Sequence, residues 1–119
     1  MQRALPPDDL SPTEFFLEWV PRAVASDPSR SAKLAGVDAT VEFTLVGEQG
    51  GVFSVRIVEG RVEGSVGAVD VADLRVELAV DTWRRLNRGD LSAPEAVLKR
   101  SLKFHGSFLL GLKLHLILG

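Results

Sequence analysis

The sequence predicts a fold of strands and helices in which an antiparallel or mixed sheet is covered on one side. Segments of alternating apolar and polar residues between positions 39 and 80 are typical of strands with one buried face. Helix-capping signals stand before and after these segments and predict helices at both ends of the chain. With 119 residues the chain has the size of one domain, which we expect at residues 11–119 after an irregular segment at 1–10.

The first helix is predicted from a capping box. Ser11 is suited to accept a bond from the first turn, and Glu14 is suited to bond back to Ser11. Aromatic residues follow at helical spacing and are interpreted as core packing: Phe15, Phe16 and Trp19. Pro21 is expected to end or kink the helix, because proline lacks a backbone donor and clashes with the preceding turn. Residues 27–36 are then expected to form a polar connection, which leaves open one helical turn around Ala32–Leu34.

Four strands are predicted from the alternation of apolar and polar residues. They span residues 39–46, 52–58, 61–67 and 72–80. A tight turn at Glu59-Gly60 is expected to join the second and third strands as a hairpin. Gly64, in the middle of the third segment, indicates an edge strand or a close approach by another part of the backbone.

The C-terminal third is predicted to contain two helices, a short strand and a last helix. Asp81 is suited to cap a helix that ends at Gly89, and Ser92 is suited to cap a second helix through residue 100. Residues 101–105 alternate as a strand, and Ser107 can cap the helix that follows. Residues 112–116 also alternate, but their leucine and lysine content favours a helix.

The end of the chain is unusually apolar. From 108 to 118 only three residues are not apolar, namely Gly111, Lys113 and His115. On a helical wheel the apolar side chains fall nearly all the way round, so one packed face cannot hold them. Eleven helical residues span roughly 16 Å, about half of a bilayer core, which argues against a membrane span. The stretch must be covered by its own fold, by a partner or by an apolar ligand, and its composition leaves all three open.

Charge is distributed unevenly along the chain. The net charge of −2 is too small to indicate nucleic acid as a partner. Residues 1–80 carry seven basic and thirteen acidic side chains, whereas residues 81–119 carry seven basic and three acidic. Basic residues beside an apolar surface suit an anionic head group, a phosphate or an acidic membrane surface. A solvated helix face is the alternative, because lysine and arginine lie on surfaces by default.

Residue types that carry catalysis or bind metals are sparse. There is no cysteine, and the two histidines, His105 and His115, lie ten residues apart outside any metal-binding motif. There is also no tyrosine, no nucleophile elbow and no visible pair of catalytic carboxylates. We therefore expect no enzyme activity, no metal and no cofactor. The first ten residues lack the apolar run of a signal peptide, which fits a cytoplasmic protein, as does the lack of cysteine.

The second half of the chain has a distinctive order of motifs. The string ADLRVELAVDTWRRLNRGDLSAPEAVLKRSLKFHGSFLLGLKL, residues 72–114, runs from an alternating strand through a helix opened by Asp81 and a Gly-Asp-Leu turn to an apolar helix with a lysine. This order resembles the sterol carrier protein 2 family of lipid-binding domains, and residues 36–43 and the Gly60 hairpin are similar to it more loosely. The resemblance implies an α+β fold: a five-stranded mixed or antiparallel sheet with helices packed on one face. It also implies a hydrophobic tunnel between sheet and helices that holds a fatty acid, fatty acyl-CoA, sterol or phospholipid.

The resemblance further implies a set of site residues. The predicted lipid-lining residues are Trp83, Leu86, Leu98, Leu102, Phe104, Phe108, Leu109, Leu112 and Leu116. The predicted head-group residues are Arg84, Arg85, Arg88 and Lys103. Gly111 would keep space open, whereas Phe108 and its neighbours are bulkier than the methionine-rich pattern of the family. The implied function is non-catalytic binding and transfer of a lipid, with transient contact to a membrane surface. The alternative is an interaction module of the same fold with a filled interior, which forms a homodimer.

Overall fold

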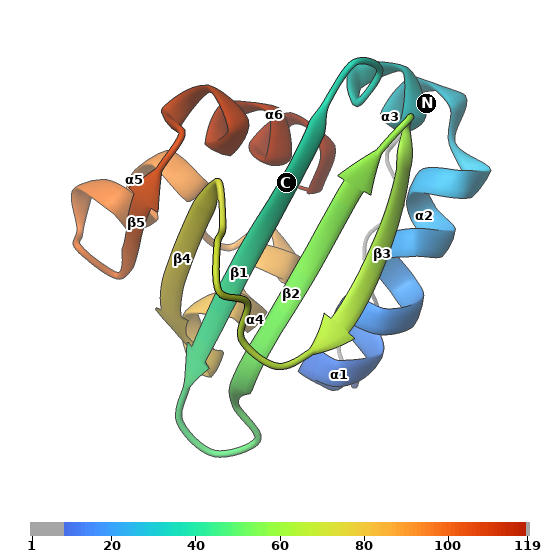
Figure 1. Ribbon diagram of the computed structural model, residues 1–119. Helices are drawn as coiled ribbons and strands as arrows, with labels where there is room; N and C mark the ends of the chain where they lie inside the picture. The colour runs from blue at the N-terminus through green and yellow to red at the C-terminus, as the bar shows by residue number, and fades with distance from the viewer. Residues whose placement is uncertain (1–8, 119) are drawn as a thin grey trace.

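A computed structural model describes residues 9–118, with side chains described through Leu114, as one five-stranded sheet with helices on one face (Figure 1). The strands are β1 (Asp38–Val46), β2 (Gly51–Val58), β3 (Arg61–Val66), β4 (Leu74–Ala79) and β5 (Leu102–Gly106). The helical segments are α1 (Pro12–Glu14), the π-helical η1 (Phe15–Trp19), α2 (Val20–Ser26), α3 (Pro28–Lys33), α4 (Val80–Arg88), α5 (Ala93–Leu98) and α6 (Phe108–Leu118). The predicted α+β class with helices on one face is confirmed.

The sheet has the order β3-β2-β1-β4-β5 and is mixed. Strands β1, β2 and β3 form an antiparallel meander, β4 pairs parallel with β1, and β5 pairs antiparallel with β4. The connection from β3 to β4 crosses the face opposite the helices (Figure 1). It is fastened there because Val69 N donates to Glu42 Oε2 at 3.0 Å and Arg75 donates to Val69 O at 3.2 Å. β3 lies at an edge of the sheet, as predicted.

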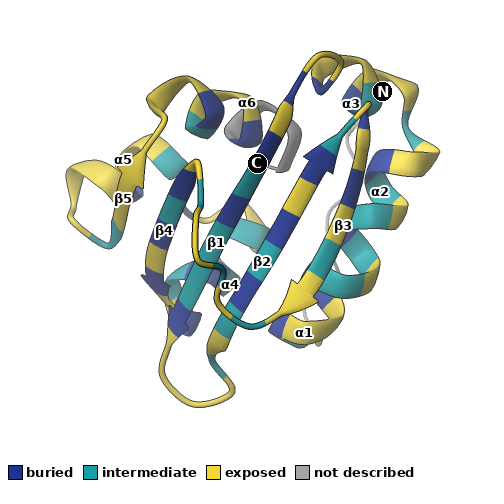
Figure 2. Ribbon diagram, viewed as in Figure 1, coloured by how far each residue is buried: buried dark blue, intermediate teal, exposed yellow. Residues whose placement is uncertain are grey.

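The core lies between the inner face of the sheet and the helices. Val41 of β1 is fully buried beside Val55 of β2 and Leu74 of β4, so the inward side chains form one continuous apolar layer. Figure 2 shows buried positions alternating with more exposed ones along the central strands. Burying each such side chain stabilises the fold by about 1.5–3 kcal/mol. The single buried face predicted from the alternation is confirmed.

The first helix begins as predicted, and of the two outcomes expected at Pro21, an end or a kink, the helix does not take the first. Glu14 N donates to Ser11 Oγ at 3.1 Å, and the reciprocal half of the capping box is also present. Val20 N–H donates to Phe15 O, five residues back, which is the wider π-helical pattern. Pro21 therefore falls in the first turn of α2, where a missing N–H is tolerated, and the helix continues to Ser26.

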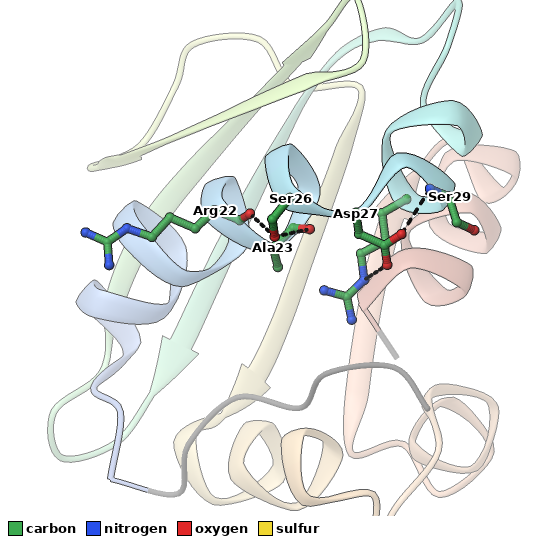
Figure 3. A network of polar contacts seen from close by, with 6 residues as sticks. Arg22, Ala23, Ser26, Asp27 and Ser29 are labelled. Atoms are coloured by element: carbon green, nitrogen blue, oxygen red, sulfur yellow. Dashed lines mark hydrogen bonds and ion pairs between the residues drawn. The ribbon is translucent and has the colours of Figure 1, made fainter. Parts of the chain in front are cut away.

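Residues 27–36 contain a helix where the sequence analysis placed a polar connection. Asp27 caps α3, because its Oδ1 accepts from Ser29 N at 3.0 Å, and Pro28 occupies the first helical position (Figure 3). The previous helix ends at Ser26, whose Oγ donates to Arg22 O at 2.8 Å. An Asp-Pro pair is a helix-start signal, but the polar composition of residues 27–36 favoured a loop.

The C-terminal elements follow the prediction with boundaries shifted by one or two residues. Asp81 was predicted as a cap and is not one, because α4 begins at Val80 with Ala79 at the N-cap position. Gly89 ends α4 with φ of 80°, and Glu95 N donates to Ser92 Oγ at 3.2 Å at the start of α5. Ser107 caps α6, since its Oγ accepts from Leu110 N at 3.2 Å.

Gly64 marks a close approach between β3 and η1. A Cβ at this position would overlap the carbonyl oxygen of Phe16 and lie 3.2 Å from the Cα of Leu17. The sequence predicted either an edge strand or a close approach here, and the structure shows both.

We expect Gly64→Ala to destabilise the protein by about 3 kcal/mol, because the new methyl group meets backbone that cannot rotate away. Ser65→Ala, at an exposed neighbour on the same strand, is the matched control and should change stability by less than about 0.5 kcal/mol. Urea unfolding of both variants measures the difference. Equal stability of the two would contradict the close approach.

Candidate functional site

A small apolar cavity lies between the sheet and the helices. The centre of a water molecule can reach about 10 Å³ of this cavity, which is enough space for about one water. The lining is entirely apolar and comes from η1, α2, the residue that follows α3, β1, β2, β3 and α6: Phe16, Val20, Val24, Leu34, Phe43, Val55, Ile57, Val62 and Leu114.

Helix α6 covers this cavity with one face and presents its other face to solvent. Leu110 and Leu114 point inward and are 6% and 9% exposed, and Leu114 forms part of the cavity wall. Phe108, Leu109 and Leu112 lie on the outer face and are 61%, 72% and 44% exposed. α6 packs against α3 of the helical layer and against β4 of the sheet. The helix is therefore apolar on both faces, as the sequence predicted.

The outer face of α6 continues onto β5. The rings of Phe104 and Phe108 lie 6.2 Å apart between centroids, and Phe104 is 40% exposed. We call the set formed by Phe104, Phe108, Leu109 and Leu112 the terminal apolar surface. Exposed apolar patches of this kind mark binding surfaces for proteins, membranes or ligands.

The predicted lipid-lining residues fall into three groups. Trp83 is buried in the core, where its ring meets that of Phe15 edge-on at 5.3 Å, and Leu86 and Leu102 pack partly buried against the same core. Four others form the terminal apolar surface, and Leu98 lies exposed on α5. The side chain of Leu116 lies outside the described residues. None of the eight described residues lines the small cavity, so their lining role stays a prediction.

The side chains that do line the cavity come mostly from the first half of the chain. Phe16, Val20 and Val24 recur at intervals of four residues along η1 and α2 and face the sheet. This spacing was visible in the sequence and was interpreted as core packing. A lining residue and a core residue have the same pattern, because both face inward on an amphipathic helix.

The predicted head-group residues lie on two elements. Arg84 of α4 places its guanidinium 5.2 Å from the ring centroid of Trp83 and donates to Leu10 O at 3.2 Å. Arg88 forms an ion pair with Asp90 at 3.5 Å, and Arg85 lies half-buried on the same helix. Lys103 is exposed on β5.

Arg30 is a buried cation that the sequence analysis did not single out. Its side chain is 3% exposed, and it is the one charged residue among the buried ones that the structure describes. Its Nε lies 3.7 Å from Asp27 Oδ2, and its guanidinium lies 5.5 Å from the ring centroid of Trp19. Arg30 stands one helical turn before Leu34, a cavity-lining residue. The helix-start signal at Asp27-Pro28 would have placed Arg30 on a helix, one turn before Leu34.

The described residues bear on two further features, metal-ligand clusters and membrane-spanning helices. No group of three histidine, aspartate or glutamate residues there is placed to hold a metal ion. Across residues 9–118 no helix has the length and apolar character needed to cross a membrane.

A comparison with protein-family models matches residues 20–119 to the SCP-2 sterol transfer family. Among curated proteins, no sequence matches this chain. The sterol carrier protein domain 2 of Helicoverpa armigera superposes with a TM-score of 0.70 at 18% identity, covering 92% of this chain and 86% of that one. Palmitated SCP2L2 from Aedes aegypti gives 0.67 at 17% identity, covering 92% and 95%.

The same fold also occurs inside a larger enzyme. The stereoselective inverting sec-alkylsulfatase Pisa1 from Pseudomonas sp. superposes with a TM-score of 0.70 at 23% identity over 92% of this chain. This chain spans only 16% of the length of that sulfatase. At these identities the structural likeness shows a shared fold.

The two faces of α6 are distinguishable by their contribution to stability. We expect Leu110→Ala to lower the free energy of unfolding by about 3 kcal/mol, because it empties a buried position. Leu109→Ala, one residue earlier on the outer face, should lower it by less than about 0.5 kcal/mol. Thermal or urea unfolding measures both, and a reversed order would mean that the outer face is the packed one.

Proposed function

The chain belongs to the SCP-2 sterol transfer family, and on that premise we propose that it binds and transfers an apolar lipid without transforming it chemically. The ligand class is a fatty acid, fatty acyl-CoA, sterol or phospholipid, held between the sheet and the helices with α6 as one wall. The palmitated Aedes aegypti relative, which shares the fold, supports a fatty acyl ligand.

The observation that carries the proposal is that α6 is apolar on both faces while it covers an apolar cavity. Ligand pockets measure roughly 300–1,000 Å³, so the cavity of about 10 Å³ must expand to take a lipid chain. We propose that the cavity expands by movement of α6 away from β4. Because both of its faces are apolar, a displaced α6 can contact the lipid with either face. Phe104, Phe108, Leu109 and Leu112 then serve as lining in the expanded state.

The energetics permit a useful affinity. A lipid segment of about twelve carbons gains roughly 10 kcal/mol on burial, at about 0.8 kcal/mol per methylene. Association removes at least about 4 kcal/mol through lost translational and rotational freedom. The remainder is at most about 6 kcal/mol before the cost of moving α6, which corresponds to a dissociation constant of tens of micromolar at best, and each further buried methylene tightens binding.

The anionic end of the ligand requires a cation, and two places offer one. Arg84, Arg85, Arg88 and Lys103 form the set inferred from the family resemblance. Arg30 adds a buried guanidinium one turn from the cavity wall, and guanidinium binds carboxylate and phosphate in a fork geometry. We propose Arg30 as an additional head-group candidate.

The second candidate function is an interaction module with a filled interior. The small cavity and the exposed terminal apolar surface both favour it. In that case the surface would pair with a second copy, and the protein would dimerise at micromolar concentration without taking up lipid. Sedimentation velocity over a range of concentrations, on protein extracted free of lipid, separates the two functions.

Lipid binding is tested by titrating delipidated protein with a fluorescent fatty acid and displacing it with palmitate. We expect micromolar binding and a bound lipid by native mass spectrometry. Leu114→Gln should weaken binding tenfold or more, because it places an amide in the apolar wall. Lys113→Gln, the adjacent position outside that wall, is the matched control and should stay within twofold. Wild-type protein that neither carries lipid nor binds the probe would rule the proposal out.

The movement of α6 is tested at Gly111. A Cβ there would meet only Leu74 Cδ2 at 3.9 Å, an ordinary contact, so alanine fits. Gly111→Ala should stabilise α6 by up to about 1 kcal/mol and slow fatty-acid uptake severalfold in stopped-flow measurements. Asn87→Ala, which raises the helix propensity of α4 instead, should leave the uptake rate unchanged. An unchanged rate in Gly111→Ala, despite higher stability, would show that uptake does not require α6 to move.

A further inference from the structure

Strand β5 is the last strand of the sheet and has one open edge. It pairs with β4 on one side, and in the described part of the chain no strand lies on its other side (Figure 1). Although α5 contacts β5, all residues from Lys103 to Gly106 are exposed. An edge strand directs the backbone N–H and C=O groups of alternate residues away from the sheet. β5 therefore offers these groups to another extended chain.

The two faces of β5 differ in character at this edge. Phe104 stands opposite buried Val76 and so lies on the inner face of the sheet, where its ring is 6.2 Å from that of Phe108. Lys103 and His105 alternate with Phe104 and lie on the outer face. A strand added at this edge would therefore place every second side chain against aromatic rings and the others beside Lys103 and His105.

The chain around the open edge carries positive charge. Residues 96–119 contain four lysine and arginine side chains and no acidic one. Arg100, in the turn before β5, and Lys103 form no ion pair with the described residues. Glu77 stands opposite Lys103, but on β4, which is the side away from the open edge. A strand added at the open edge can therefore supply carboxylates that the chain itself does not place there.

We propose that β5 binds an extended segment of a partner protein as a sixth strand, with acidic side chains on the outer face and apolar side chains on the inner face. Strand addition of this kind takes affinity from backbone hydrogen bonds and specificity from alternate side chains. The carboxylates pair with Lys103, and the apolar side chains cover Phe104 and Phe108. A segment of about five to seven residues is long enough to follow β5, at about 3.3 Å per residue. The docking does not depend on lipid binding.

The strand register argues against a second copy of the chain as the occupant. Two copies of β5 paired antiparallel over their full length place Lys103 of one copy opposite His105 of the other. A shift of two residues places Lys103 opposite Lys103, or His105 opposite His105. A shift of one residue would exchange the apolar and polar faces. None of these registers gives Lys103 a carboxylate, and like charges directly opposite each other destabilise a strand pair.

The other edge of the sheet differs from β5 in both respects. At Gly64 of β3 the backbone of η1 lies so close that the inner face has no room for a further side chain. On the outer face of β3, Glu63 would repel an acidic segment, and Arg61 already forms an ion pair with Glu59 at 3.5 Å. β3 is therefore the internal comparison for β5.

The proposal is tested with a labelled peptide of about seven residues that alternates valine and glutamate, bound to the full chain and followed by fluorescence anisotropy. We expect saturable binding, and at least tenfold weaker binding when lysine replaces glutamate in the peptide. Lys103→Glu should weaken binding of the acidic peptide tenfold or more and should prefer the lysine peptide, a reversal that misfolding would not produce. Arg61→Glu, on the outer face of β3, is the matched control and should bind within twofold of wild type.

The backbone component is tested by N-methylating the peptide, either at its valines or at its glutamates. Because only alternate N–H groups of an added strand face β5, one methylated peptide should lose binding and the other should keep it. Equal affinity of the two would contradict strand addition. Wild-type protein that does not bind the acidic peptide, or Lys103→Glu that binds it as wild type does, overturns the proposal. So does protection of the β5 amides from hydrogen exchange that rises with protein concentration alone, which assigns the edge to a second copy.

Discussion

The fold depends on one requirement, which is that the apolar inner face of the sheet be covered across its whole width. Segments η1 and α2 cover the β2–β3 side, and they approach so closely that Gly64 leaves no room for a side chain. Helices α4 and α6 cover the β4 side. The two halves of the cover differ in how they are held. In the η1–α2 half, the backbone of η1 lies close to the backbone of β3 at Gly64. In the other half, α6 is held by the buried apolar side chains of Leu110 and Leu114.

On the proposed function, α6 is the part of the cover that moves and the η1–α2 part is the one that stays. Among its described contacts, α6 is fixed at its start by the Ser107 cap and along its length by apolar packing. Apolar packing has no directional preference, so α6 can exchange protein neighbours for lipid methylenes with little loss. A charged or hydrogen-bonded anchor would oppose such an exchange, because a buried polar group left unpaired costs about 1–3 kcal/mol. The apolar character of the C-terminal stretch is therefore the property that suits it to border a lipid site.

The features that the sequence predicted correctly are those that depend on interactions between residues close together in the chain. The strands followed from alternation, and the caps at Ser11, Ser92 and Ser107 followed from residue type and position. The π-helical turn before Pro21 and the burial of Arg30 did not follow, because each depends on what the rest of the fold packs against that residue. The sequence also could not predict which side of α6 faces the sheet. When apolar residues surround a helix, periodicity gives no direction, and only the position of β4 makes Leu110 and Leu114 the inward pair.

A filled interior is the arrangement that a lipid binder of this size should have at rest. An empty cavity of about 300 Å³ would destabilise the domain by about 7 kcal/mol, at about 24 cal/mol per Å³. Such a loss approaches the whole stability of a small domain, which is about 5–15 kcal/mol. Closing α6 onto the sheet avoids it and leaves about 10 Å³. Releasing Leu110 and Leu114 then costs several kcal/mol, which burial of about twelve methylenes offsets. On the proposed function, the small cavity is what remains of a ligand site when α6 packs against the sheet.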